Sequence, residues 1–225
     1  LMVPVYQKKV AIVTGGAQGI GLAICRELGR CNIKIALVDK DEKKAKEAEK
    51  TLMFEGLDCK FFHADLSIIN SVSCIPSEVA SHFGNIDIIV NNAAPKRDRK
   101  FIGMPSIDDW HAHEKLMLSA PFLLCENSKE YLSRSAGCII NISSTVANAV
   151  AYEQCSLSYH ASKAAMNAMT RYLAVSYGDL GIRVNAVAPG VIDREIGPRI
   201  SKNKIKKPII ERIVPLKRAG SAADV

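Results

Sequence analysis

Short apolar runs alternate with segments of helical periodicity along most of the chain. The apolar runs predict strands at residues 9–14, 33–39, 59–64, 86–91, 138–143 and 182–188. The intervening segments predict helices at residues 19–31, 41–55, 68–83, 107–133 and 155–180. Within these helices, Pro76 predicts an irregular start and Pro121 a break. The strands lack the polar alternation of half-exposed sheets, which indicates that helices cover both faces.

The repeated β-α alternation predicts an α/β fold with a single doubly wound, mostly parallel sheet of the Rossmann-like type. No linker or repeat divides the 225 residues, so we expect one domain over residues 1–225. Ser221 and Asp224 have the spacing of an N-terminal capping box, which should open a helix. Because the sequence ends one residue later, we expect that a C-terminal helix and strand are missing from it.

Composition narrows the class of protein. Apolar residues make up 48% and charged residues 24% of the chain, which excludes disordered and collagen-like classes. The seven cysteines have no C-x-x-C spacing, so they predict neither a disulfide framework nor a zinc site. The chain begins without a signal-peptide pattern and contains no apolar run of membrane-spanning length. We therefore expect a cytoplasmic protein that does not enter a membrane.

The net charge of +7 is concentrated in one segment. Residues 194–218 contain nine Lys and Arg against two Glu, so the rest of the chain is close to neutral. A local excess is typical of a solvated segment or a site for an acidic ligand, and no aromatic residues interleave it as in nucleic-acid binders. His111 and His113 would point about 200° apart on a helix, so they predict no metal site.

A glycine-rich turn, T-G-G-A-Q-G-I-G at residues 14–21, joins the first predicted strand to the first helix. Glycines allow a tight turn and let the backbone approach a pyrophosphate, while the helix N-terminus offers free N–H groups to phosphates. We therefore expect a dinucleotide to contact Gly15, Gln18, Gly19, Ile20 and Gly21. The alternative is a glycine-rich connection that binds no ligand.

Asp39 ends the second predicted strand. A carboxylate at this place can accept hydrogen bonds from the ribose hydroxyls of the adenosine and would repel a 2′-phosphate. Asp39 therefore favours NAD over NADP as the cofactor, although Lys40 could moderate the repulsion. The alternative role for Asp39 is to cap the charged helix that follows it.

Tyr159 and Lys163 form a Y-x-x-x-K pattern on a predicted helix. Four residues turn a helix by about 400°, so the two side chains share one face. A free phenol is a poor base at neutral pH, and a neighbouring ammonium favours its ionised form. Tyr159 can then exchange a proton with a substrate oxygen, and Ser144, at the end of the fifth strand, can hold that oxygen in line. The alternative is a solvated helix face without a catalytic role.

Together these motifs resemble the short-chain dehydrogenase/reductase family, from about residue 8 to residue 225. The resemblance also rests on H-A-D-L at 63–66, N-N-A-A at 91–94 and R-V-N-A-V-A-P-G at 183–190. It implies hydride transfer between a nicotinamide cofactor and a secondary alcohol or ketone, with Tyr159 as acid/base and Ser144 orienting the substrate oxygen. It implies a homo-oligomer, a dimer or tetramer, in the complete protein. It further implies that the cofactor contacts Asp65, Leu66, Asn91, Ala93, Tyr159, Lys163, Pro189, Gly190 and Ile192.

The chain departs from the family pattern near the expected catalytic residues. A family asparagine that holds a water beside the lysine would fall at Met117, and methionine cannot hold that water. The departure predicts a slower proton relay, a substitute group, or a nucleotide-binding member with weak catalysis and a binding or regulatory role. Ser143 or Ser158 could take the place of Ser144, which we nevertheless favour for its position at the strand end.

The resemblance also implies a substrate-covering lid at about residues 192–218, which here is strongly basic. Lys96 and Arg97 lie in a second basic cluster after the fourth predicted strand, so both clusters would rim the same cleft. These charges predict an acidic substrate, such as a carboxylate or a phosphate-bearing acyl carrier, and a 3-oxoacyl-thioester reductase is then an alternative. A solvated basic lid with no role in specificity is the simpler interpretation.

Overall fold

The computed structural model describes residues 8–95, 104–150, 155–193 and 199–225. The described strands form one parallel sheet of six strands in the order β3-β2-β1-β4-β5-β6. Their bounds are β1 (Val10–Thr14), β2 (Lys34–Asp39), β3 (Cys59–His63), β4 (Ile88–Asn91), β5 (Cys138–Ile142) and β6 (Arg183–Val187). The predicted doubly wound α/β fold is therefore confirmed, with every described strand pair parallel.

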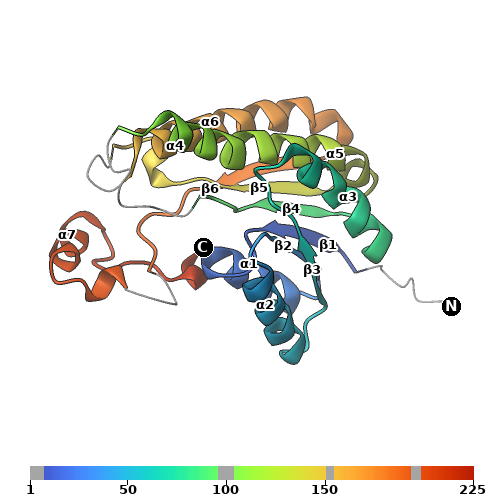
Figure 1. Cartoon of the computed structure of the whole chain (residues 1–225), viewed down its shortest axis with the longest axis horizontal. Helices are drawn as coiled ribbons and strands as arrows, with labels where there is room; N and C mark the ends of the chain where they lie inside the picture. Colours follow the sequence, from blue (N-terminus) through green and yellow to red (C-terminus); the bar gives the residue numbers. More distant parts are fainter. Residues whose placement is uncertain (1–7, 96–103, 151–154, 194–198) are drawn as a thin grey trace.

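Helices cover the sheet on both faces (Figure 1). One face carries α1 (Gly19–Arg30) and α2 (Glu42–Phe54), and the other carries α3 (Ile69–Phe83), α4 (Ile107–Glu114), α5 (Ala120–Arg134) and α6 (Leu157–Ser176). Strand β1 serves both layers, because successive side chains of a strand point to opposite faces. Val10 and Ile12 pack in the core beneath α3, α5 and α6, whereas Ala11 and Val13 pack against α1 and α2. This double burial explains the uninterrupted apolar run of the strand.

Pro76 lies inside α3 and not at an irregular start, so that expectation was wrong. The helix begins at Ile69, and Val72, Ile75 and Val79 on one side are all buried against the core. Proline removes one backbone hydrogen bond from a helix, but burial of this apolar side keeps the helix continuous across it.

The predicted break near Pro121 is present as a change of helix type. Helix α4 ends at Glu114, a π-helical turn covers Lys115–Ser119, and α5 starts at Ala120 with Pro121 in its first turn. Proline has no N–H to donate to the carbonyl four residues earlier, so the regular ladder cannot pass through this point. The wide turn places Met117 in the interior, where it is fully buried.

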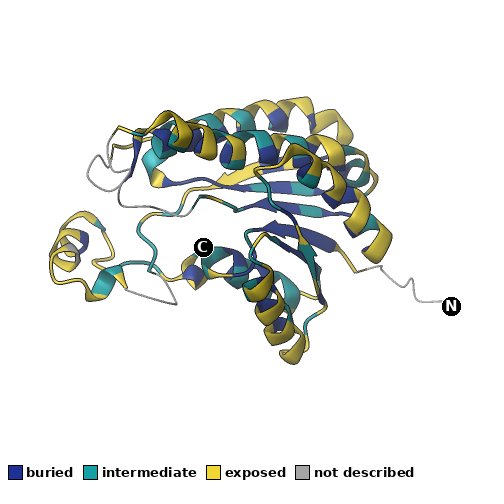
Figure 2. Ribbon diagram, viewed as in Figure 1, coloured by how far each residue is buried: buried dark blue, intermediate teal, exposed yellow. Residues whose placement is uncertain are grey.

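Figure 1 shows that the chain beyond β6 extends to one side of the sheet, where α7 (Lys206–Ile213) lies, and then returns to end beside α1. Helix α7 is largely exposed (Figure 2). A bridge between Ile192 and Gly220 closes this segment at its base. The predicted capping box of Ser221 and Asp224 is present, and it opens the short turn Ala222–Asp224. Among the described residues, no helix is long and apolar enough to cross a membrane.

Candidate functional site

The glycine-rich turn brings backbone segments together too closely for side chains. Gly15 and Gly19 have φ values of +65° and +56°, in the left-handed region that favours glycine. A Cβ atom on Gly21 would lie 2.1 Å from the carbonyl oxygen of Gly15. Gln18 is the N-cap residue of α1 without a side-chain cap hydrogen bond, and Ile20 lies in the first turn. The turn is thus a backbone cradle at a helix N-terminus, a geometry suited to phosphate groups.

Two residues that the sequence reasoning missed hold this turn in place. Thr14 Oγ1 donates to the Val90 carbonyl at 3.2 Å and accepts from the backbone N–H groups of Asn92 and Ala93 at 3.0 and 3.2 Å. Asn92 Nδ2 donates to the carbonyl oxygens of Thr14 and Gly15 at 2.9 and 3.2 Å. The sequence signal that could have identified them is a polar residue at the end of β1 and another directly after β4. These two strands are neighbours in the sheet.

Asp39, at the end of β2, also stabilises the glycine-rich turn by accepting hydrogen bonds. Its Oδ2 accepts from the backbone N–H of Ala17 at 3.1 Å, and its Oδ1 accepts from that of Asp41 at 3.0 Å. The alternative role of Asp39 as a helix cap is wrong, because Asp41 caps α2 by accepting from the N–H of Lys44 at 3.2 Å. Asp39 remains partly exposed beside the glycine turn.

The residues expected to contact the adenine and its ribose lie just after β3 and at the end of β4. Asp65 accepts from the N–H and hydroxyl of Ser67 at 2.9 and 2.7 Å. Although partial burial opposes ionisation, these hydrogen bonds lower the pKa of Asp65. Leu66 packs partly against the larger core. Asn91 is buried, and its Nδ2 donates to Asn141 Oδ1 at 2.9 Å, so this side chain ties β4 to β5.

Tyr159 and Lys163 lie one turn apart on α6, as predicted. Ser156 caps the helix by accepting from the N–H of Tyr159 at 3.3 Å. Lys163 is only 2% exposed, and its ammonium donates to the Ile142 carbonyl at 2.5 Å. The same ammonium lies 5.8 Å from the centre of the Tyr159 ring. A fixed positive charge therefore lies beside the phenol at the carboxyl end of β5.

Ser144 differs from the two other candidate serines in what its hydroxyl does. Ser143 Oγ donates to the Lys163 carbonyl at 3.5 Å, and Ser158 Oγ donates to Asp109 Oδ2 at 2.6 Å. Ser144 Oγ instead accepts from the N–H of Val146 at 3.4 Å, and its own hydrogen has no acceptor among the described residues. Ser144 is therefore the serine whose hydroxyl can still donate to a ligand.

The segment after β6 adjoins this serine. The N–H of Thr145 donates to the carbonyl of Pro189 at 3.1 Å, which joins the ends of β5 and β6. Gly190 follows, and Ile192 pairs with Gly220 at the base of the segment that carries α7. The basic residues predicted to rim the substrate cleft are only partly described, because Lys96, Arg97 and Arg194 lie outside the described residues. The rim cations that the structure describes are exposed: Arg199, Lys202, Lys204 and Lys207.

No group of three or more potential metal ligands occurs among the described His, Cys, Asp and Glu residues. His111 is exposed, whereas His113 is 7% exposed on the inner side of α4. The two side chains thus point away from each other, as their spacing predicts.

Known proteins resemble this chain over most of its length. A family model described as short chain dehydrogenase matches residues 9–205. L-fucose dehydrogenase from Rattus norvegicus is 32% identical over 224 residues, covering 98% of this chain and 81% of that protein. D-threitol dehydrogenase from Mycolicibacterium smegmatis is 35% identical over 190 residues, covering 84% and 72%. A solved short chain dehydrogenase from Burkholderia cenocepacia, in complex with NADP, has a TM-score of 0.85 at 28% identity, covering 97% and 87%.

Proposed function

Because the chain belongs to the short-chain dehydrogenase/reductase family, we propose that it interconverts a secondary alcohol and a ketone by hydride transfer with NAD(H). The observation that carries the proposal is the buried Lys163 ammonium, 5.8 Å from the Tyr159 ring on the same helix. A neighbouring cation stabilises the negative charge that develops on a tyrosine oxygen as it gives up its proton.

The residues of the glycine turn fit a dinucleotide. The space that a Cβ on Gly15 would fill is bounded by the Ala93 Cα at 3.0 Å and by Asn92 Nδ2 at 3.1 Å, so a side chain at this position would meet both. Gln18, Gly19 and Ile20 would offer the N–H groups of the α1 N-terminus to the phosphates. Asp39 would accept from the adenosine ribose hydroxyls, which supports NAD over NADP even though two structural relatives are complexes with NADP or NADPH.

The remaining predicted contacts follow the carboxyl edge of the sheet. Asp65 and Leu66 would border the adenine, and Asn91 and Ala93 the adjoining ribose. Lys163 would hold the nicotinamide ribose hydroxyls with its ammonium, and the nicotinamide end would contact Pro189, Gly190 and Ile192. The bound nicotinamide would supply or accept the hydride.

Three residues of the protein would act on the substrate oxygen, directly or through a neighbouring group. Ser144 Oγ would donate to this oxygen, since its hydrogen has no other described acceptor. Tyr159 would give a proton to that oxygen during ketone reduction and take it back during alcohol oxidation. Lys163 would keep the phenol ready for both directions through its charge.

Two observations support different classes of substrate. The names of two relatives, L-fucose dehydrogenase and D-threitol dehydrogenase, support a hydroxylated substrate. The exposed cations Arg199, Lys202, Lys204 and Lys207 instead favour an acidic substrate, including an acyl thioester on a phosphate-bearing carrier.

All seven cysteines are free thiols, which supports a reducing, cytoplasmic location. A dimer or tetramer remains our expectation for the oligomeric state.

A second candidate function is nucleotide binding with weak catalysis, which the full burial of Met117 favours. One experiment separates the two. NADH and NADPH binding is measured by fluorescence titration, and turnover is followed by absorbance over a panel of sugars, polyols, simple alcohols, oxo acids and a 3-oxoacyl thioester. Turnover that Tyr159→Phe abolishes while NADH binding persists supports the dehydrogenase. Binding without turnover over the whole panel supports the second candidate.

A further inference from the structure

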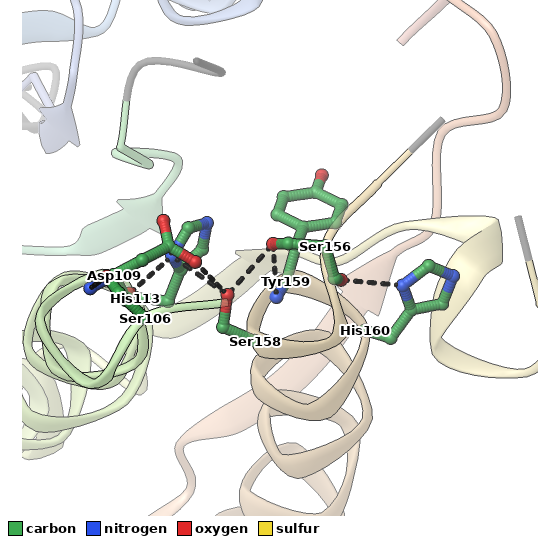
Figure 3. A network of polar contacts seen from close by, with 7 residues as sticks. All are labelled: Ser106, Asp109, His113, Ser156, Ser158, Tyr159 and His160. Atoms are coloured by element: carbon green, nitrogen blue, oxygen red, sulfur yellow. Dashed lines mark hydrogen bonds and ion pairs between the residues drawn. The ribbon is translucent and has the colours of Figure 1, made fainter. Parts of the chain in front are cut away.

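A buried polar cluster adjoins Tyr159 and has no role in the mechanism above (Figure 3). On α4, His113 Nδ1 lies 2.8 Å from the carbonyl oxygen of Asp109 and 3.3 Å from its Oδ1. On α6, Ser158 Oγ lies 2.6 Å from Asp109 Oδ2 and 2.8 Å from Ser156 Oγ. The cluster therefore links α4 to the helical turn that carries Tyr159.

The partners fix the direction of each hydrogen bond. A backbone carbonyl and an ionised carboxylate only accept, so His113 Nδ1 must carry a hydrogen. The Ser158 hydroxyl donates its one hydrogen to Asp109 Oδ2. In the hydrogen bond between the two serines, Ser158 must therefore accept and Ser156 must donate. In the neutral imidazole with a protonated Nδ1, Nε2 is left with a lone pair and acts as an acceptor.

The cluster contains a serine, a histidine and an aspartate, but its geometry is not that of a hydrolase. A nucleophilic triad uses opposite ring nitrogens for the serine and the aspartate. Here Nδ1 of His113 faces both, at 3.3 Å from Ser158 Oγ and 3.3 Å from Asp109 Oδ1. Ser158 is thus not activated as a nucleophile, and the described residues offer Nε2 no hydrogen-bond partner.

The acceptor nitrogen lies beside the reacting phenol. The rings of His113 and Tyr159 are nearly perpendicular, at 82°, with centroids 6.1 Å apart. In Figure 3, Nε2 lies on the side of the imidazole that faces Tyr159, and this nitrogen and the Tyr159 hydroxyl project from their helices toward the same side of the view. A molecule whose oxygen binds Tyr159 can therefore extend its adjoining group toward the His113 ring.

We propose that His113 is a specificity-determining residue: its Nε2 accepts a hydrogen bond from a hydroxyl on the carbon next to the reacting carbon. The substrate class would then be vicinal diols and the matching hydroxyketones. The inference rests on the proposed function, because it places the reacting oxygen at Tyr159. An acceptor beside the reacting phenol favours substrates whose hydroxyl can donate to it over substrates that lack one.

The kinetic test compares cyclohexane-1,2-diol with cyclohexanol as substrates. In the wild type, kcat/KM should be higher for the diol, and His113→Phe should lower the diol-to-alcohol ratio about tenfold, the value of one hydrogen bond. His113→Gln, which retains an amide acceptor, should recover part of the ratio. The matched control is His111→Phe on the exposed side of α4, which should leave the ratio unchanged. A ratio that does not fall in His113→Phe overturns the proposal.

A second measurement does not depend on turnover. Long-range ¹H–¹⁵N NMR at neutral pH, assigned with His113→Phe, should show a protonated Nδ1 and an unprotonated Nε2. Adding the diol to the NADH-saturated protein should shift the Nε2 resonance, and cyclohexanol should not. A protonated Nε2 in the neutral ring, or equal shifts with both ligands, overturns the role of His113. Absence of turnover over the substrate panel would count against the proposed function instead, while the resonances still decide the role of His113.

Discussion

The Lys163 ammonium donates to the backbone carbonyl of Ile142 across 2.5 Å, joining α6 to the end of β5. Lys163 is 2% exposed, and a buried charge is costly unless it has hydrogen-bond partners. The carbonyl is such a partner, and it fixes the position of the positive charge in the folded protein. The charge is thus in place beside Tyr159 before any ligand binds.

Replacement of this lysine should separate catalysis from stability. In Lys163→Met, the charge beside Tyr159 is lost while an unbranched side chain of similar length fills the interior. We expect kcat/KM to fall by about 100-fold or more, and the melting temperature to stay the same or rise. Steady-state kinetics and thermal unfolding check this, with Lys43→Met on the exposed face of α2 as the control. Wild-type kcat/KM in Lys163→Met would remove the lysine from the mechanism.

The close approach inside the glycine turn makes Gly21 intolerant of any side chain. In Gly21→Ala the new Cβ would lie 2.1 Å from the Gly15 carbonyl oxygen, and the backbone would have to shift. We expect a loss of about 1–3 kcal/mol or more in the free energy of unfolding, together with weaker NADH binding. A Cβ on Gly178 would meet nothing within 4 Å, so Gly178→Ala is the matched control. Equal urea midpoints for the two variants would contradict the prediction.

The charge of Asp39 should set the cofactor preference. Asp39→Asn keeps an oxygen that can accept from the Ala17 N–H but removes the negative charge that faces a 2′-phosphate. We expect the ratio of kcat/KM for NADP to that for NAD to rise about tenfold. Asp41→Asn, which still caps α2, is the control for a general change in charge. If both variants change the ratio equally, Asp39 has no specific role.

Buried thiols should make the fold sensitive to alkali. Burial raises the pKa of the Cys125 thiol from 9.0 to about 12, so the folded protein keeps its proton where the unfolded chain has lost it. The stabilisation is complete below about pH 9 and is lost as the pH rises toward 12, at about 1.4 kcal/mol per pH unit. Cys125→Ala should therefore show a shallower loss of unfolding free energy between pH 9 and 11 in urea titrations.

The exposed Cys74 supplies the control for this slope. In Cys74→Ala the dependence of unfolding free energy on pH should match that of the wild type. A slope in Cys125→Ala as steep as that of the wild type would mean that this thiol does not contribute to alkaline unfolding.

The sequence predicted the sheet well because burial on both faces leaves an unmistakable apolar run, as in β1. It predicted the Tyr159–Lys163 pair because helical spacing alone places the two side chains together. It failed at Pro76, where tertiary burial of the apolar side of α3 outweighs the local effect of proline. The Asp109–His113–Ser158 cluster could not be predicted, since its partners are 45 and 49 residues apart and meet only when α4 packs on α6.

Thr14 and Asn92, which are 78 residues apart in the sequence, hold the glycine turn by hydrogen bonds. They meet because β4 pairs with β1 in the sheet. The chain must form β1, β2 and β3 and then cross to the other side of β1 to add β4 before these hydrogen bonds can form. Contacts between residues so far apart in sequence carry a larger entropic cost of loop closure. The nucleotide cradle is therefore a property of the finished sheet and not of the N-terminal β-α unit. A ligand that binds only the finished turn stabilises the β1–β4 junction together with it, so the free energy of unfolding should rise with ligand concentration.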